Sequence, residues 1–322
     1  MIDNDGVACE ARPACPACGA AGALLHDNLT DRLFGAPGLW SVRRCGPCGL
    51  GWTDPQPHAD QIGRFYDAYW THAADGGRED PGLWRSQGLR RIVKAALAVL
   101  LFWRRTAFRS DLQYLHGLRP GRVLDVGCGN GRFLAAAVAA SWEGVGVDFD
   151  ASAVAAARLR PGLDVRVGDL EGCAFPSSSF DAVVLDNVIE HVPDPAATFA
   201  ECARLLRPGG RLVMITPNLD SLGHQAFGAD WRGLETPRHL HLFTARALRA
   251  FARRAGFASG AVCTSTGQTA PDWPMLRSSI DAARSAGRGP AAIDLRALRW
   301  KERLLDLLGV SRGEWVVLVA TR

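Results

Sequence analysis

The chain contains no apolar segment long enough to cross a membrane. Its longest apolar run, Ala95 to Trp103, is far short of the roughly 20 residues that a spanning helix needs. Basic residues flank this run and permit a weak interfacial contact through residues 90–109, although a helix buried against the protein is favoured. The first ten residues contain Asp3, Asp5 and Glu10 and no apolar core, so we expect no secretory signal and a cytoplasmic protein.

The chain also lacks a large excess of charge of either sign. The 37 basic and 33 acidic side chains give a net charge of +4, which does not indicate a nucleic-acid partner. With 48% hydrophobic and 22% charged residues, the composition is that of a folded globular protein and excludes disordered, collagen-like and coiled-coil chains. A length of 322 residues fits about two domains.

The nine cysteines are odd in number, and we expect no disulfide framework. Four of them form two Cys-x-x-Cys turns, Cys15 with Cys18 and Cys45 with Cys48, each followed by glycine and separated by 26 residues. One tight turn can aim two sulfurs at one ion, and four thiolates complete a closed tetrahedral site, so the spacing predicts structural zinc. Redox activity of one pair is the alternative, but it leaves the second pair unexplained. Cys9 falls outside the pattern, and we expect a free tail thiol.

Short apolar segments near these cysteines predict strands at Leu39–Arg44 and Leu50–Trp52, before a break at Asp54–Pro57. We therefore expect a zinc-ribbon domain over residues 1–57. Residues 58–115 are predicted to form a helical acceptor or lid segment, and residues 116–322 the second domain. Aromatic side chains outside the predicted sheet are expected to line an acceptor pocket: Phe65, Tyr66, Tyr69, Trp70, Trp84, Phe102, Trp103, Phe227 and Trp231.

From about residue 120, short apolar runs alternate with helix-like segments, which predicts an α/β doubly wound, Rossmann-like domain. The expected strands are Arg122–Val126, Gly144–Asp148, Asp164–Gly168, Asp181–Asp186 and Arg211–Thr216. The expected helices are Arg132–Ala140, Ala151–Arg158, Ala196–Leu206 and Ala245–Ala255, with an amphipathic helix near Leu295–Leu308. Ligands of such sheets bind at the carboxyl ends of the strands.

A glycine-rich loop follows the first of these strands. The loop has no side chain at three positions, Gly127, Gly129 and Gly131, so a ligand can approach its backbone closely. Asp125 precedes these glycines. A carboxylate at that place suits a ligand with a cationic amine better than a pyrophosphate. Asp148 ends the next strand, 21 residues after Gly127, where an acid can accept hydrogen bonds from ribose hydroxyls.

The motifs appear in a characteristic order along the chain. The loop, Asp148, Asp169, the segment Phe180–Asp194 and the segment Leu206–Leu212 together resemble the class I S-adenosylmethionine-dependent methyltransferases over residues 115–260. The cysteine pairs, with residues 216–218 and 237–244, resemble a subgroup that has an amino-terminal zinc ribbon and acts on natural products and surface polysaccharides. The resemblance implies seven strands in the order 3-2-1-4-5-7-6, with an antiparallel last strand at Glu314–Thr321.

The resemblance also implies roles for single residues. It assigns S-adenosylmethionine contacts to Asp125 and the three glycines at the methionine part, to Asp148 at the ribose and to Asp169 at the adenine. Asn187 is expected beside the cofactor. Some related ubiquinone-pathway enzymes have an acidic metal ligand at the position of Asn187, and an amide is a poor substitute, so a catalytic metal is not expected.

The predicted reaction is methyl transfer to a small-molecule or carrier-linked acceptor, with O-methylation favoured. An attacking hydroxyl needs a base, and we rank His239 slightly ahead of His191 because the loop containing His239 and His241 is predicted to face the acceptor. Arg238 is a candidate anion clamp. The alternatives are an RNA methyltransferase that grips its substrate through the ribbon, and a non-catalytic cofactor-binding scaffold.

Overall fold

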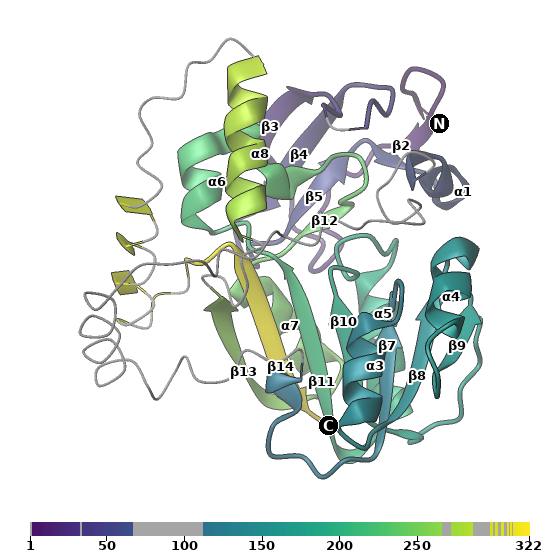
Figure 1. Cartoon of the computed structure of the whole chain (residues 1–322). Helices are drawn as coiled ribbons and strands as arrows, with labels where there is room; N and C mark the ends of the chain where they lie inside the picture. Colours follow the sequence, from purple (N-terminus) through teal and green to yellow (C-terminus); the bar gives the residue numbers. More distant parts are fainter. Residues whose placement is uncertain are drawn as a thin grey trace, which may run out of the picture.

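The described residues form three β-sheets with three, seven and four strands. In the computed structural model, the two N-terminal sheets lie above the seven-stranded sheet, which is built from the C-terminal part of the chain (Figure 1). The structure describes residues 2–32, 34–66, 112–265, 272–285 and 312–322, together with residues 297, 298, 300, 301, 304, 305, 308 and 310. Within these residues, no helix combines the length and the apolar character needed to cross a membrane.

The larger sheet has seven strands in the order β13-β14-β11-β10-β7-β8-β9. Numbered along the chain and taken from the other edge, this is 3-2-1-4-5-7-6, the order that the family resemblance implies. β14 runs antiparallel to both β11 and β13, whereas the other pairings are parallel. The strands are β7 (Arg122–Val126), β8 (Glu143–Asp148), β9 (Asp164–Val167), β10 (Phe180–Asp186), β11 (Leu206–Pro217), β13 (Ala258–Ser265) and β14 (Trp315–Thr321).

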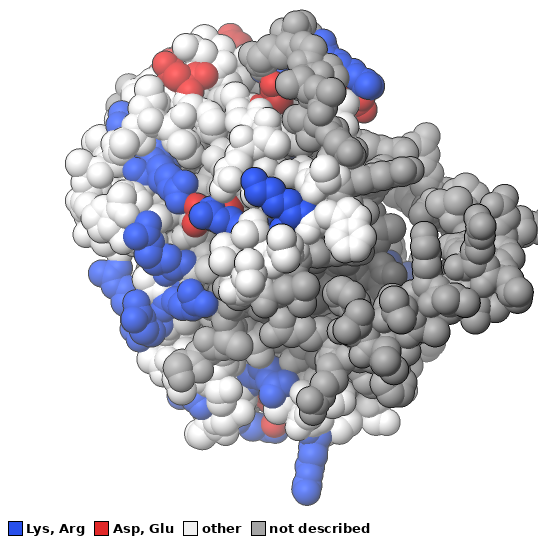
Figure 2. Space-filling view, turned by 90° about the vertical axis from the view of Figure 1, so that its left-hand side faces the viewer, with Lys and Arg blue, Asp and Glu red and all other residues white. Residues whose placement is uncertain are grey.

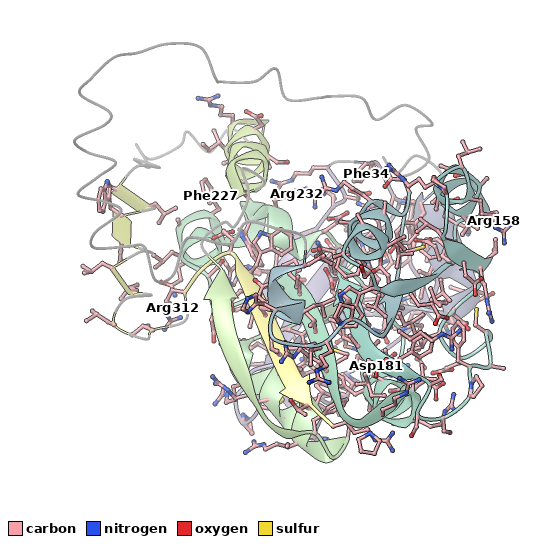
Figure 3. All side chains as sticks on the ribbon, turned by 60° about the horizontal axis from the view of Figure 1, so that its bottom comes forward. Phe34, Arg158, Asp181, Phe227, Arg232 and Arg312 are labelled. Atoms are coloured by element: carbon pink, nitrogen blue, oxygen red, sulfur yellow. The ribbon has the colours of Figure 1, made fainter. Side chains whose placement is uncertain are left out.

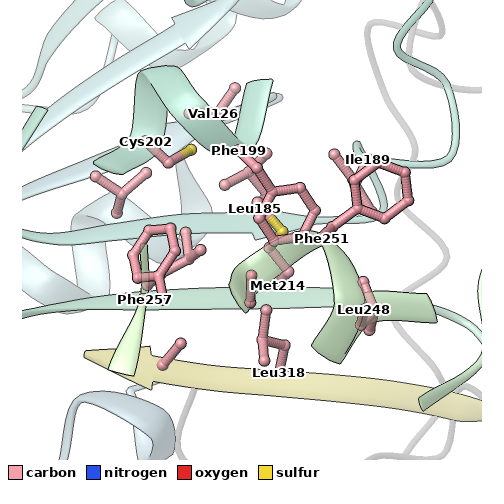
Figure 4. Close-up of a cluster of buried hydrophobic side chains, with 14 of the residues drawn as sticks. Val126, Leu185, Ile189, Phe199, Cys202, Met214, Leu248, Phe251, Phe257 and Leu318 are labelled. Atoms are coloured by element: carbon pink, nitrogen blue, oxygen red, sulfur yellow. The ribbon is translucent and has the colours of Figure 1, made fainter. Parts of the chain in front are cut away.

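Alternate residues of the central strands pack against helices on opposite faces. Leu124 and Val126 belong to the core under α5 (Pro195–Leu205) and α7 (Ala245–Arg254), which Figure 4 shows. Val123 faces the other side with α3 (Arg132–Ala139). α4 (Ala151–Arg158) packs on β8 and β9. Because the strands are buried on both faces, their sequences are nearly continuous apolar runs.

Side-chain caps set the starts of these helices. The Asp194 carboxylate accepts hydrogen bonds from two backbone amides in the first turn of α5, and Pro195 occupies the first helical position. The Thr244 hydroxyl caps α7 in the same way, and Arg253 and Arg254 lie in its last turn. Because these caps are local sequence signals, the predicted starts of α5 and α7 lie within one residue of the observed ones.

The N-terminal part forms a second, four-stranded antiparallel sheet in the order β12-β5-β4-β3. One of its strands comes from far along the chain, because β12 (His241–Leu242) pairs with β5. The two parts share a core that includes Trp40, Phe65 and Trp231. The remaining N-terminal elements are β1 (Ile2–Asp3), β2 (Ala8–Glu10), β3 (Gly22–Leu29), β4 (Trp40–Cys45), β5 (Gly51–Asp54), β6 (Gln56–Pro57) and α1 (Ala59–Ile62).

Two further helices, α6 (Leu222–Phe227) and α8 (Asp272–Ser285), lie beside the N-terminal sheet (Figure 1). Among the predicted strands, β11 differs most from its predicted bounds, since it begins at Leu206 and not at Arg211. The pairing of β10 with β11 continues across a register shift, so the residues between Leu206 and Arg211 belong to the strand. The predicted interfacial segment 90–109 and most of the predicted helix at 295–308 lie outside the described residues, as do Tyr69, Trp70, Trp84, Phe102 and Trp103.

Candidate active site and cysteine cluster

The four cysteines of the two Cys-x-x-Cys turns converge. The Sγ atoms of Cys15 and Cys48 are 3.5 Å apart, as are those of Cys18 and Cys45, and all four lie within 4.8 Å of one another. Four sulfurs at 2.3 Å from one tetrahedral ion would be about 3.8 Å apart, so the cluster has the size of a zinc site.

The two turns have the same backbone structure. Gly19 N donates to Cys15 O at 2.8 Å, and Gly49 N donates to Cys45 O at 2.9 Å. Both glycines have positive φ, at 74° and 78°, a conformation that other residues rarely adopt. The glycine after each pair is therefore required by the turn that aims the sulfurs.

The chemistry of the cluster also favours a cation. Burial raises the pKa of the Cys15 and Cys48 thiols, so thiolates there need a compensating charge. Burial acts in the same direction on Cys45, but hydrogen bonds from Cys48 and the other cysteines outweigh it and lower its pKa. Cys9 is a free thiol, as predicted, but it lies fully buried in β2 and not in a tail; its Sγ donates to Val7 O at 3.3 Å.

The glycine loop lies at the carboxyl ends of β7 and β8, as predicted. Gly127, Gly129 and Gly131 all have positive φ, and a Cβ at Gly127 would come within 2.4 Å of the Val188 side chain. The carboxylate of Asp148 accepts from Gly129 N at 2.8 Å, while its other oxygen accepts from Asp150 N at 2.9 Å. A carboxylate oxygen can accept more than one hydrogen bond, so this side chain can also accept from a ligand.

Carboxylates concentrate negative charge around this loop. Asp125 is buried, and desolvation, followed by the charges of Asp186 and Asp148, raises its pKa well above the ordinary value. A cationic ligand would relieve this repulsion.

Asn187, with φ of 56°, donates its amide to Asp186 Oδ1 at 2.9 Å. Asp169 is exposed and accepts from Gly172 N at 2.5 Å, which is a turn contact that leaves its second oxygen available.

His191 follows β10 and is half-buried beside the loop. Its Nδ1 lies 3.0 Å from the carbonyl oxygen of Arg238 and 2.8 Å from the hydroxyl of Tyr66. A carbonyl oxygen only accepts, so we assign the proton to Nδ1 and the lone pair to Nε2. Within the described part of the chain, Nε2 has no hydrogen-bond partner. The Tyr66 ring also contacts Phe149, which follows Asp148, at 5.2 Å between centroids.

His239 lies behind His191, with the two rings 4.7 Å apart in a T-shaped contact. It is only 4% exposed, and its Nδ1 is hydrogen-bonded to Gly233 O at 2.8 Å. Burial lowers the pKa of His239 to about 3 and also lowers the pKa of His191. A nitrogen with a pKa near 3 is a weak proton acceptor at neutral pH, so His191 is the better placed of the two.

Glu190, His191 and His239 bring ligand atoms within 4.8 Å of one another, a spacing that can hold a divalent cation. Burial raises the pKa of Glu190 to about 8, so this carboxyl is neutral at pH 7 and must lose its proton before it can act as a ligand. Glu235 differs: burial opposes its ionisation, but His239 and Arg232 outweigh burial and lower its pKa to about 2.

Arg238 is not a surface anion clamp. Its side chain is fully buried and donates two hydrogen bonds to Asp31, at 2.8 and 2.9 Å, and a third to Glu235 at 3.2 Å. Its guanidinium carbon lies 4.4 Å from the centre of the Phe34 ring. Figure 3 labels Phe34 and Arg232 in this part of the molecule, where the N-terminal part meets the loop before β12. The arginine therefore joins the two parts of the chain.

The sequence does not indicate three residues of this site as members of the histidine cluster. Asp31 and Glu235 occur in no motif, and Tyr66 is predicted only to line the acceptor pocket. Asp31 is 207 positions from its partner Arg238, and Tyr66 is 125 positions from His191. Spacing along a single chain carries no signal for such contacts, whereas the cysteine pairs and glycine loop are local patterns.

His241 does not join the His191 cluster. It is fully buried in β12, and within the described residues neither ring nitrogen makes a hydrogen bond. Burial lowers its pKa to about 4. Between about pH 6.5 and pH 4, His241 is therefore protonated in the unfolded chain but neutral in the folded chain. The folded state loses stability as the pH falls through this range.

We expect His241→Leu to weaken acid destabilisation. The imidazole costs about 1.4 kcal/mol for each pH unit below 6.5, so the variant should be relatively stabilised by about 2 kcal/mol at pH 5 compared with pH 7. Urea unfolding at both pH values measures this difference. His116→Leu, at an exposed position, is the matched control. Equal pH dependence in His241→Leu and the wild type would contradict the prediction.

Comparison with known proteins agrees with this geometry. Residues 101–260 match the family model described as a methyltransferase domain. A 37.1 kDa transposon protein of Streptomyces fradiae is 36% identical over 209 residues, which are 58% of each chain. The ubiquinone biosynthesis O-methyltransferase of Aromatoleum aromaticum is 36% identical over 133 residues, covering 39% of this chain and 57% of that protein. The chain thus spans a little over half the length of these two relatives.

Among solved structures, an S-adenosylmethionine-dependent methyltransferase of Thermotoga maritima is 21% identical, with a TM-score of 0.45, and the match covers 72% of this chain and 96% of that one. Residues 101–260, which include the glycine loop and the strands β7 to β11, are thus similar to a methyltransferase domain.

Proposed function

We propose that this protein transfers a methyl group from S-adenosylmethionine to a hydroxyl of a small-molecule or carrier-linked acceptor. The observation that carries the proposal is the glycine loop surrounded by Asp125, Asp148 and Asp186. Three carboxylates at the ends of adjacent strands attract a ligand with a sulfonium and an ammonium group. A pyrophosphate would be repelled there.

The cofactor assignments follow from the loop. Asp125 and the glycines would bind the methionine part, and Asp148 would accept from the ribose hydroxyls. Asp169 would use its second oxygen for the adenine amine, and Asn187 would border the site beside Asp186. Bound S-adenosylmethionine supplies an activated methyl group, so the protein has to align the acceptor and remove its proton.

We propose His191 as the base, in place of the higher-ranked His239. The lone pair on Nε2 and the contact through Tyr66 to Phe149 support this choice. The similarity to ubiquinone biosynthesis O-methyltransferases supports oxygen as the attacking atom. An acceptor proton would move to Nε2 as the oxygen attacks the methyl carbon.

We further propose that Cys15, Cys18, Cys45 and Cys48 hold one zinc ion with a structural role. The convergent sulfurs and the duplicated turns support it. Four cysteine ligands leave no position for water or substrate, so the ion would stabilise the fold and take no part in the transfer.

Exposed arginines support an anionic acceptor or an acidic carrier. The helix α7 exposes four arginines and contains no acidic residue: Arg246, Arg249, Arg253 and Arg254. Figure 2 shows that basic side chains gather over part of one face, with few acidic ones among them. Such a face attracts anions over about 10 Å at ordinary salt.

The RNA alternative receives less support from the ribbon itself. Arg43 forms an ion pair with Asp54, and Arg44 forms one with Asp220 at 2.5 Å. Both arginines that precede the second cysteine turn, in β4, are thus engaged within the protein. RNA binding would favour a basic stripe on the ribbon.

The test is formation of S-adenosylhomocysteine by the zinc-loaded protein. Phenols, catechols, sugar hydroxyls, carrier-linked hydroxyls, primary amines and structured RNA are each supplied with S-adenosylmethionine. We expect turnover with a hydroxyl acceptor. Turnover only with amines or RNA, or no turnover with any class, would contradict the proposal.

A further inference from the structure

We propose that Asp31, in the N-terminal part of the chain, is a positioning residue that acts on His191 through Arg238. The inference rests on the proposed function, because it takes His191 as the base. It concerns which nitrogen of His191 carries the proton, a property that no motif in the sequence indicates.

The first step is the fixation of the Arg238 side chain. The guanidinium is fully buried and meets the Asp31 carboxylate through two parallel hydrogen bonds of 2.8 and 2.9 Å. Asp31 is itself buried, with a side chain 1% exposed. A buried guanidinium without its carboxylate is strongly unfavourable, so Asp31 determines where this side chain can lie.

The second step leads from the Arg238 side chain to its backbone. The carbonyl oxygen of the same residue accepts from His191 Nδ1 at 3.0 Å. Nη1 also donates to Phe65 O at 3.3 Å, so the arginine is held at several points. With the side chain fixed at its far end, the peptide has little freedom to turn its carbonyl away from the imidazole.

The third step concerns the competing partner of Nδ1. The Tyr66 hydroxyl lies 2.8 Å from the same nitrogen and can either accept or donate a hydrogen bond. The Arg238 carbonyl can only accept. If the carbonyl moves away, the Tyr66 hydroxyl can donate to Nδ1, and the ring proton then belongs on Nε2. Protonated Nε2 has no lone pair for the acceptor proton.

A purely structural role for Asp31 makes a different prediction. The carboxylate also accepts from Phe34 N at 3.2 Å and from Ala36 N at 2.9 Å, contacts that order the local turn. If these contacts were its whole purpose, its loss would lower stability and leave the tautomer of His191 unchanged.

The experiment is long-range ¹⁵N–¹H correlation spectroscopy of the zinc-loaded full chain with labelled histidine. His191 signals are assigned by their loss in His191→Gln. We compare the wild type with Asp31→Asn, Asp31→Glu and Asp230→Asn. Asp230 is the matched control, because it is buried and pairs with Arg32 across the same boundary. Turnover and cofactor affinity are measured on the same samples.

We expect the Nδ1–H tautomer for His191 in the wild type and in Asp230→Asn, and a mixture in Asp31→Asn. Turnover of Asp31→Asn should fall about 10- to 100-fold with cofactor affinity kept, and Asp31→Glu should recover part of the loss. The Nε2–H tautomer in the wild type would overturn the inference even if Asp31→Asn fails to fold. So would a wild-type tautomer in folded Asp31→Asn, or an equal change in Asp230→Asn. Absence of methyl transfer with every acceptor overturns the proposed function instead, because the tautomer is observed without an acceptor.

Discussion

Cys45→Ser is expected to lose zinc and unfold the N-terminal sheet. Structural zinc contributes on the order of 10 kcal/mol to the folding of small four-ligand sites, so this is the largest effect that we expect from one substitution. The loss should extend to catalysis, since Asp31 and Tyr66 belong to the same part of the chain and contact Arg238 and His191. Zinc content per chain, thermal unfolding and turnover measure the three effects.

The matched control for this variant is Cys9→Ser. Cys9 is a buried free thiol in the same part of the chain, but its sulfur is not in the cluster. We expect this variant to keep one zinc per chain. A wild-type protein without zinc, or full zinc content in Cys45→Ser, would contradict the metal assignment.

His191→Gln is expected to lower turnover by about 100-fold or more with a hydroxyl acceptor, because loss of a general base typically has this magnitude. Cofactor affinity should stay near that of the wild type, since Asp148 and the glycine loop are unchanged. Steady-state kinetics and calorimetry with S-adenosylmethionine separate the two quantities.

His239→Gln provides the comparison for His191→Gln. His239 is 4% exposed and lies behind His191, so we expect the smaller loss from this variant. A larger loss in His239→Gln would restore the order that the sequence suggested. Near-normal turnover in both variants would mean that alignment alone suffices, or that the acceptor is carbon or an amine.

The predictable parts of this protein are those whose signal is local. The strand at Arg122–Val126 and the helix at Ala151–Arg158 coincide with the observed β7 and α4 in both bounds. Each cysteine pair and the glycine loop are recognisable from a few consecutive residues. The structure brings the four cysteines together, and all three glycines of the loop have positive φ. Apolar periodicity, tight turns and positive-φ glycines are all short-range requirements.

The parts that could not be predicted depend on pairing between distant segments. The two-residue strand β12 is too short to have a pattern, and it completes a sheet whose next strand lies about 190 residues earlier in the chain. The sequence predicts Arg238 as a candidate anion clamp, because arginines are rarely buried unless paired and nothing in the sequence matches this one with Asp31. The sequence ranks His239 slightly ahead of His191 because its loop is predicted to face the acceptor; the burial of that loop is a tertiary property that the sequence does not indicate.

The most direct test of the account is calorimetric titration of the zinc-loaded protein with S-adenosylmethionine, in the wild type and in Asp148→Asn. Asp164→Asn, at an exposed acid at the start of β9, is the control. The account predicts one site per chain, an affinity reduced by about 1 to 3 kcal/mol in Asp148→Asn alone, and weaker binding of a nicotinamide dinucleotide. Unchanged affinity in Asp148→Asn, or tighter binding of the nicotinamide dinucleotide than of S-adenosylmethionine, would contradict it.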